Sequence, residues 1–165
     1  MSETWDVTDQ GSVVIRQYSP VDFKSLHKVF YKWALENNYK YNENFQEKAK
    51  SHGKDFEIGW RFEKKVTEFV MYEVHVAIWA YGMNPVKAGD KELMQGNLEI
   101  VFNAYMILDW QNRSEFSALK KFMRFLYINY IKKGEFLGHW EKCWTETYSL
   151  HADVKAFLNM MHIEK

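Results

Sequence analysis

Two stretches of alternating residues, Phe69 to Met83 and Leu98 to Trp110, constrain the fold of this chain more than any other feature. Every second residue in them is mostly apolar: Val70, Tyr72, Val74, Val76, Ile78 and Ala80 in the first, and Leu98, Ile100, Phe102, Ala104, Met106 and Leu108 in the second. Successive side chains of a strand point to opposite faces of its sheet. The pattern therefore predicts a sheet with one apolar face, which requires a cover.

The residues between these apolar positions mix polar and aromatic side chains. They are Glu73, His75, Trp79 and Tyr81 in the first stretch, and Glu99, Asn103, Tyr105 and Asp109 in the second. Two interpretations of this mixed face stay open. Either it is a surface that binds something, or the amino-terminal helix packs on it as a second cover, which would make a fold of three layers.

Three helices are predicted from caps and from apolar spacing. Ser19 and Pro20 are typical of an N-cap and a first helical residue, and Asn37 is a suitable end. The segment from Asn112 to Glu115 has capping-box spacing before a second helix that we expect Gly134 to end. A third, long helix follows, whose apolar columns are Leu137, Trp140, Trp144, Thr147, His151, Val154, Leu158 and Met161, with Phe136, Cys143, Leu150 and Phe157 beside them.

A short β-prone run at residues 13–15 and an alternation at residues 56–62 add further strands, and residues 84–97 are expected to form a connector or a small hairpin extension. Together the elements predict a single α+β domain over residues 1–165. Its antiparallel sheet has four to five strands. An amino-terminal helix and two carboxy-terminal helices cover the sheet.

Composition excludes several classes of protein. Lys plus Arg equals Asp plus Glu at 22 each, so no basic surplus is present to neutralise nucleic-acid phosphates. The basic pairs at residues 64–65, 120–121 and 132–133 are interpreted as solvated ends of elements. The most apolar window, residues 66–83, contains Glu68, Glu73 and His75, so no membrane span is expected. The start of the chain lacks the features of a signal peptide, which predicts a cytoplasmic protein, or a virion protein if the chain is phage-encoded.

The search for catalytic motifs finds no phosphate-binding glycine loop, no zinc-type pairing of cysteine and histidine, and no nucleophile elbow. The best candidate is a polar cluster of Glu73, His75, Glu99 and Asn103 on the mixed face, which could hold a divalent metal or act in acid–base chemistry. Charge pairs across a solvated sheet explain these residues better, so we predict no catalytic residue, no metal and no cofactor. Cys143 and His151 lie about 12 Å apart along one helix, too far for a nucleophile and its base.

The runs 53–60 (GKDFEIGW), 64–67 (KKVT), 96–100 (GNLEI) and 154–158 (VKAFL) resemble small proteins of archaeal and large-phage genomes for which no activity is known. The resemblance covers roughly residues 39 to 160. Its motifs are turns and strand starts. It implies a virus-encoded or accessory protein and transfers no site residue.

The favoured functional hypothesis is a non-enzymatic structural or assembly protein, such as a virion or large-complex component, that binds protein partners or itself. Aromatic residues are enriched in protein interfaces, and the predicted interface residues are Trp5, Trp79, Tyr81 and Tyr105.

The alternative hypothesis is a small-molecule-binding domain with an apolar cavity between the sheet and the long carboxy-terminal helix. The predicted lining residues are Trp60, Phe102, Met106, Trp140, Trp144 and His151. An enzyme that uses Glu73, His75 and Glu99 is the third hypothesis.

Overall fold

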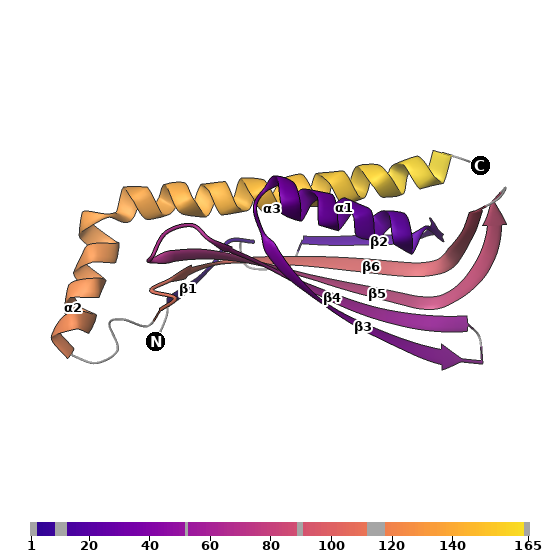
Figure 1. Cartoon of the computed structure of the whole chain (residues 1–165), viewed down its shortest axis with the longest axis horizontal. Coiled ribbons are helices and arrows are strands. Elements are labelled where there is room, and N and C mark those ends of the chain that lie inside the picture. Colours follow the sequence, from indigo (N-terminus) through magenta and orange to yellow (C-terminus); the bar gives the residue numbers. More distant parts are fainter. Residues whose placement is uncertain (1–2, 9–12, 52, 89–90, 112–117, 164–165) are drawn as a thin grey trace.

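The computed structural model describes residues 3–8, 13–51, 53–88, 91–111 and 118–163 (Figure 1). The elements follow one another in the order β1 (Glu3–Asp6), β2 (Val13–Val21), α1 (Phe23–Glu36), β3 (Lys40–Lys50), β4 (Gly53–Lys65), β5 (Val70–Ala88), β6 (Lys91–Leu108), α2 (Ala118–Leu126), the π-helical segment η1 (Tyr127–Ile131) and α3 (Lys133–Ile163). The α+β class with an antiparallel sheet is confirmed.

The sheet has six strands, and all its pairs are antiparallel. Strands β3, β4, β5 and β6 pair in sequence order, and β1 and β2 both pair with β6. Because β5 occupies one edge of β6, the two amino-terminal strands share the other edge, at residues 105–108 and 94–102 respectively. Because both strands fit along this edge, the sheet has six strands, whereas four to five were expected.

Helices α1 and α3 lie on the same side of the sheet (Figure 1). They cover the predicted apolar face, whose alternating residues in β5 and β6 are all buried. From α1, Phe30 stacks on Trp60 of β4, with ring centroids 5.3 Å apart, and from α3, His151 contacts Phe102 of β6. The three-layer alternative is therefore wrong: in the described part of the chain, no helix covers the mixed face.

Helix α1 begins later than predicted. Ser19 and Pro20 belong to β2, where they pair with residues 96 and 95 of β6, so they cannot also cap a helix. The N-cap is Asp22, whose carboxylate accepts hydrogen bonds from the backbone N–H groups of Lys24 and Ser25 at 3.0 and 3.2 Å. The predicted end at Asn37 is confirmed.

The carboxy-terminal part is nearly continuous helix that turns at Lys132, where φ is −116° and ψ is 16°. The prediction that Gly134 ends a helix is wrong, because Gly134 lies in the first turn of α3. The capping box at residues 112–115 lies outside the described residues. The long helix is confirmed, although only part of its predicted apolar surface is buried, since Leu137 and Trp144 are exposed.

The predicted hairpin extension is confirmed, because β5 and β6 stay paired as far as residues 88 and 91. The register shifts between Tyr81 and Asn84, where Gly82 has a φ of +61°. A Cβ atom on Gly96 would lie 2.7 Å from the Tyr81 carbonyl oxygen, so the two strands approach closely at this point. Beyond it both strands curl towards the side of the helices (Figure 1).

Candidate functional site

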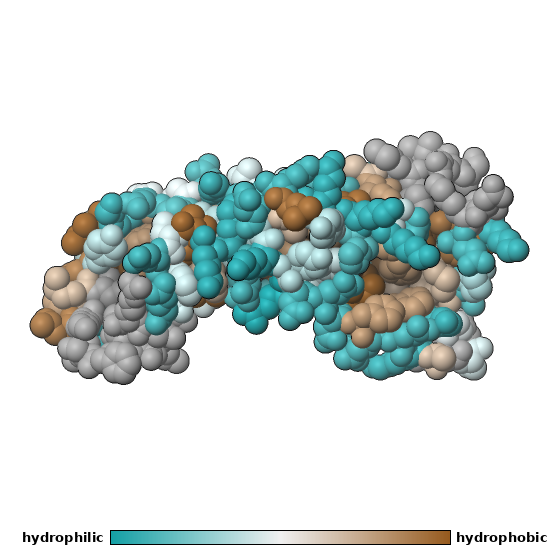
Figure 2. Space-filling model, in the orientation of Figure 1, coloured by the Kyte–Doolittle hydropathy of each residue, from teal (hydrophilic) through white to brown (hydrophobic). Residues whose placement is uncertain are grey.

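A pocket of about 520 Å³ lies between α1 and the sheet. Its lining is mostly apolar and comprises Phe23, Lys24, Leu26, His27, Lys28 and Phe30 of α1, Glu43 and Phe45 of β3, Ile58 and Trp60 of β4, and Ile78 of β5. The space exists because β3 and β4 slope away from α1, while β5 and β6 curl towards it (Figure 1). Figure 2 shows hydrophobic atoms between the hydrophilic surfaces of α1 and the β3 edge.

Aromatic rings fix the shape of this pocket. Phe23 at the start of α1 lies 5.4 Å from Phe56 of β4, measured between ring centroids. Phe56 in turn lies 6.1 Å from Phe45 of β3, which is exposed. These ring contacts connect α1 to β4 and β4 to β3 around the pocket.

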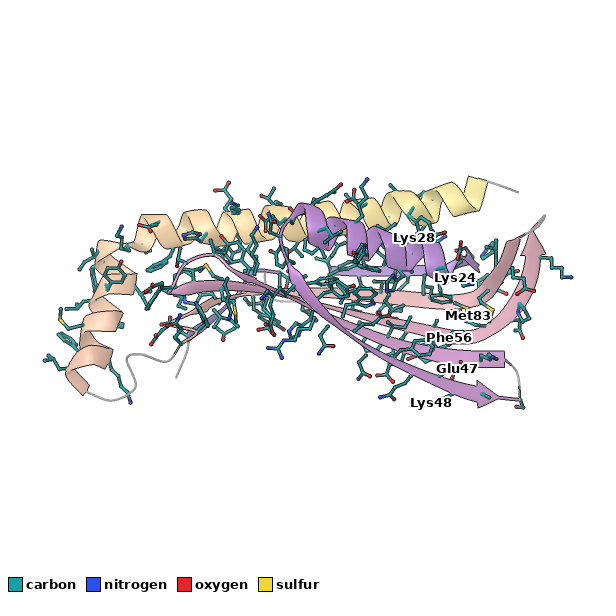
Figure 3. All side chains as sticks on the ribbon, in the orientation of Figure 1. Lys24, Lys28, Glu47, Lys48, Phe56 and Met83 are labelled. Carbon is teal, nitrogen blue, oxygen red and sulfur yellow. The ribbon has the colours of Figure 1, made fainter. Side chains whose placement is uncertain are left out.

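Polar groups occupy the rim of the pocket. His27 Nε2 of α1 lies 3.1 Å from Glu43 Oε2 of β3, and the His27 ring packs against Trp60 at a centroid distance of 4.7 Å. Lys24 and Lys28, one helical turn apart on α1, also line the pocket (Figure 3). The pocket lining therefore contains two ammonium groups, one histidine and one carboxylate. Such a rim favours a ligand with an acidic group.

Of the six residues predicted to line a cavity, Trp60 lines this pocket. Phe102 and Met106 are fully buried under α3. Trp140 donates its indole N–H to the Asp6 carbonyl oxygen at 3.0 Å, and Trp144 is exposed. The predicted residues are thus spread along the molecule, and the pocket belongs to α1 instead of α3.

His151, the last of the six, lies on α3 beside Phe102. Burial lowers its pKa, and the neighbouring Lys155 lowers it further, so its ring is neutral at pH 7. It packs on the core and does not line the pocket.

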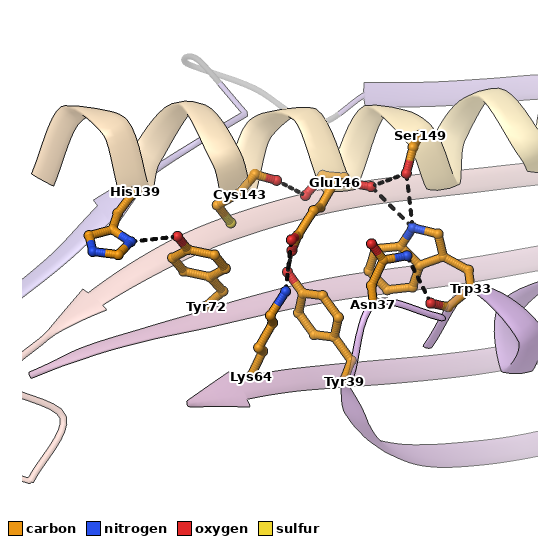
Figure 4. A network of polar contacts seen from close by, with 10 residues as sticks. Trp33, Asn37, Tyr39, Lys64, Tyr72, His139, Cys143, Glu146 and Ser149 are labelled. Atoms are coloured by element: carbon orange, nitrogen blue, oxygen red, sulfur yellow. Dashed lines mark hydrogen bonds and ion pairs between the residues drawn. The ribbon is translucent and has the colours of Figure 1, made fainter. Parts of the chain in front are cut away.

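A buried polar network ties α3 to the sheet and to α1 (Figure 4). Lys64 Nζ of β4 lies 2.7 Å from Glu146 Oε1 of α3, and Tyr39 donates its hydroxyl to Glu146 Oε2 at 2.8 Å. The indole N–H of Trp33 donates to Ser149 Oγ and to the Glu146 carbonyl oxygen. Lys64 is therefore a largely buried ion-pair partner, and its interpretation as a solvated strand end is wrong.

The ionisable groups beside this network are held neutral. Burial raises the pKa of the Cys143 thiol to about 12, with Glu146 adding to the rise. Burial is also the main cause of the raised pKa values of Tyr39 and Tyr72. A thiol without thiolate character is a poor nucleophile. The network therefore fixes α3 in place and offers no activated group.

The predicted polar cluster divides into two separate ion-pair groups. Glu73 Oε1 lies 2.5 Å from His75 Nε2 and 2.6 Å from Arg61 Nε, whereas Glu99 pairs with Arg16 of β2. The strand register separates them, because Glu73 lies opposite residue 105 and Glu99 lies opposite residue 79. Within the residues that the structure describes, no group of three His, Cys, Asp or Glu side chains could hold a metal ion.

The predicted interface residues lie on two faces. Trp79, Tyr81 and Tyr105 lie on the mixed face, and Tyr81 is exposed. Trp5 pairs with Met106, a residue of the apolar face, and its ring lies 6.5 Å from that of Phe136. Trp5 therefore packs against the core and cannot share a surface with the other three.

The residues of the pocket rim were missed in the sequence. The only local signal near them is a weak alternation, with Tyr39, Tyr41 and Phe45 on one side of residues 39–46. What no local pattern shows is that this strand faces the first turns of α1, which brings Glu43 to His27.

Comparison of the chain with protein-family models, curated proteins and solved structures gives no match. The resemblance to small archaeal and phage proteins therefore stays a prediction. As for membranes, the described helices include none that is long and apolar enough to cross one.

Proposed function

We propose that this protein binds an amphiphilic small molecule, with an apolar body and an acidic group, in the pocket between α1 and the sheet. The observation that carries the proposal is the pocket itself: about 520 Å³, lined by aromatic and aliphatic side chains, with charged groups at the rim. Ligand pockets of proteins occupy roughly 300–1,000 Å³ and combine an apolar lining with a few polar groups.

The charges of the rim suggest which end of the ligand lies outermost. Lys24 and Lys28 extend from α1, and Glu43 is already engaged by His27. A carboxylate or phosphate at the mouth would meet the two ammonium groups, while an alkyl or ring system would lie against Trp60 and Ile78. Burying that apolar part supplies about 25 cal/mol per Å² of area removed from water.

The test uses a long-chain fatty acid as the probe, with binding to the full chain measured by calorimetry. Phe45→Ala removes an exposed wall of the pocket, where 53% of the residue is accessible, so folding is preserved. We expect its Kd to rise about tenfold through lost apolar contact. The matched control is Phe122→Ala on α2, a residue 57% exposed and outside the pocket, which should bind as the wild type does.

A charge test separates the rim from the apolar lining. The double variant Lys24→Gln/Lys28→Gln should weaken fatty-acid binding and leave binding of the corresponding fatty alcohol unchanged. Lys32→Gln is the control, because Lys32 lies on α1 away from the pocket lining and pairs with Glu36 at 3.7 Å. The proposal would be contradicted if the wild type bound neither the fatty acid nor the fatty alcohol.

A second candidate function is assembly, either with another copy or with a protein partner in a virion or another large complex. The observation that favours it is the mixed face, which carries Trp79, Tyr81 and Tyr105 and is not covered by a helix in the described part of the chain. Tyr18 of β2 and Tyr81 of β5 lie on either side of residue 97, with which both pair, and Tyr18 is also exposed. Exposed aromatic residues among polar ones are typical of protein interfaces.

A further inference from the structure

The segment formed by α2 and η1 exposes an unusual number of large apolar side chains. They are Leu119, Phe122, Met123, Phe125, Tyr127, Tyr130 and Ile131. Figure 1 shows α2 extending away from the sheet at the end of the molecule where α3 begins, and Figure 2 shows hydrophobic surface at that end. Soluble proteins rarely expose so many apolar residues together on their surface unless the patch binds something.

Most apolar residues of α2 share one side of the helix. Leu119, Phe122, Met123 and Leu126 occupy positions i, i+3, i+4 and i+7, so they form an apolar stripe along α2. This stripe cannot turn into the core, because η1 is anchored by its opposite side. Ile128 is fully buried there.

The Tyr127 ring completes this anchor. Its centroid lies 6.1 Å from those of both Phe69 and Phe136. Phe136 belongs to the hydrophobic core, and Phe69 packs against that core. Segment α2–η1 is therefore held with its apolar stripe outwards.

The charge of the same segment is one-sided. Residues 118–133 contain no Asp or Glu, and their basic residues are Lys120, Lys121, Arg124, Lys132 and Lys133. Lys132 forms an ion pair with Glu135, and Lys121 is exposed. The rest of the chain must carry the compensating acidic surplus, because the net charge of the whole is zero.

We propose that α2–η1 docks on the surface of an anionic lipid bilayer. Helices that lie in the membrane interface combine a stripe of Phe, Leu and similar residues with Lys and Arg beside it. The stripe would enter the boundary between headgroups and acyl chains, and each basic residue near the surface adds to the attraction by acidic lipids. At 9 residues in α2 and 5 in η1, the segment is about 20 Å long and lies on the bilayer without crossing it.

Charge also decides against a second copy as the partner. Two chains packed through this segment would bring two basic clusters together, with no acidic residue in either segment to pair with them. An anionic membrane supplies the missing negative charge, and it accepts apolar side chains without any defined complementary shape.

The test measures sedimentation of the full chain with vesicles of phosphatidylcholine alone and of phosphatidylcholine mixed with phosphatidylserine. We expect binding to the acidic vesicles, weak binding to the neutral ones, and loss of binding at about 0.5 M salt, where the charges are screened. Leu119→Ser should lower the partition constant about fivefold, because it removes an apolar group from the docked stripe.

The controls keep each result interpretable. Leu119 is 69% exposed, so its variant should fold, and Leu35→Ser on α1, where the residue is 57% exposed, is the matched change away from the segment. Lys121→Gln should also weaken binding, and Lys32→Gln should not. Lack of binding to acidic vesicles, equal binding to neutral ones, or a dimer that Leu119→Ser dissociates would overturn the proposal. Fatty-acid binding in the pocket is measured without vesicles, so the two proposals can fail separately.

Discussion

Three weakly acidic side chains are buried at the interface between α3 and the sheet. Cys143, Tyr39 and Tyr72 lie together near Glu146, and burial raises the pKa of each one. A neutral thiol and two neutral phenols are compatible with an interior position, but their ionised forms are not. Ionisation of these three residues at alkaline pH therefore destabilises the folded protein.

The first prediction at this scale is a loss of stability at alkaline pH. A group whose pKa is higher in the folded state stabilises the protein below its unfolded pKa, and this contribution is lost as the pH rises towards the folded value. For Cys143 the window extends from about 9 to about 12. We expect the free energy of unfolding to fall by about 2 kcal/mol between pH 8 and pH 10.5 from this thiol, with Tyr39 and Tyr72 adding to the fall.

Urea unfolding at the two pH values measures this effect. In Cys143→Ala the thiol is absent, so the fall should be smaller by the contribution of that group, whatever the variant's stability at pH 8. Wild type and variant with the same dependence on pH would show that the thiol does not control the alkaline transition.

At the scale of the elements, sequence patterns succeeded where the information was local. The alternation in residues 70–80 and 98–108 identified a buried face correctly, because a period of two is imposed by the strand itself. The start of α1 was misplaced by three residues because Ser19 and Asp22 are both competent caps. Pairing of Ser19 with β6 decides between them, and this tertiary contact leaves no local trace.

The same comparison explains the error at Gly134. Glycine after two lysines is typical of a helix end, yet here the break comes two residues earlier, at Lys132. Burial of Ile128 and Phe136 on either side fixes where the chain turns. The turn is therefore a consequence of packing, which a local pattern does not record.

The cap of α1 provides a direct prediction. Asp22→Ala removes the acceptor of two backbone hydrogen bonds and of one from the Ser25 hydroxyl, and we expect it to destabilise the protein by about 1 kcal/mol. Thermal or urea unfolding measures the loss. Asp22→Asn keeps a capping oxygen and should retain most of the stability, so equal losses in the two variants would contradict the assignment of the cap.

At the scale of the whole molecule, function was less predictable than fold. Trp60 was expected to line a cavity and does line the pocket, but under α1 instead of α3. The sequence predicts both α1 and α3. It does not show which of the two helices leaves a space between itself and the sheet. That distance depends on how far β3 and β4 twist, a property of the assembled sheet. For α2, the helical spacing of its apolar residues does not show by itself whether the stripe is buried or exposed.

The mixed face provides the last prediction, which separates assembly from ligand binding. If this face is an interface between copies, native mass spectrometry of the chain purified alone should show a discrete oligomer. Tyr81→Ser, at a residue 49% exposed on the mixed face, should dissociate it, whereas Tyr31→Ser, at a residue 42% exposed on α1, should not. Leu119→Ser serves as a second control, because an oligomer that depends on Leu119 would be formed through α2.

A monomer would contradict self-assembly through the mixed face, and its mass would still be informative. An added mass that is lost in Phe45→Ala and kept in Phe122→Ala would place a co-purified molecule in the pocket, since Phe45 lines the pocket and Phe122 does not. The value of that mass would then identify the class of ligand. Because Tyr81, Phe45 and Leu119 belong to three different surfaces, variants at these positions assign any oligomer or adduct to one of them.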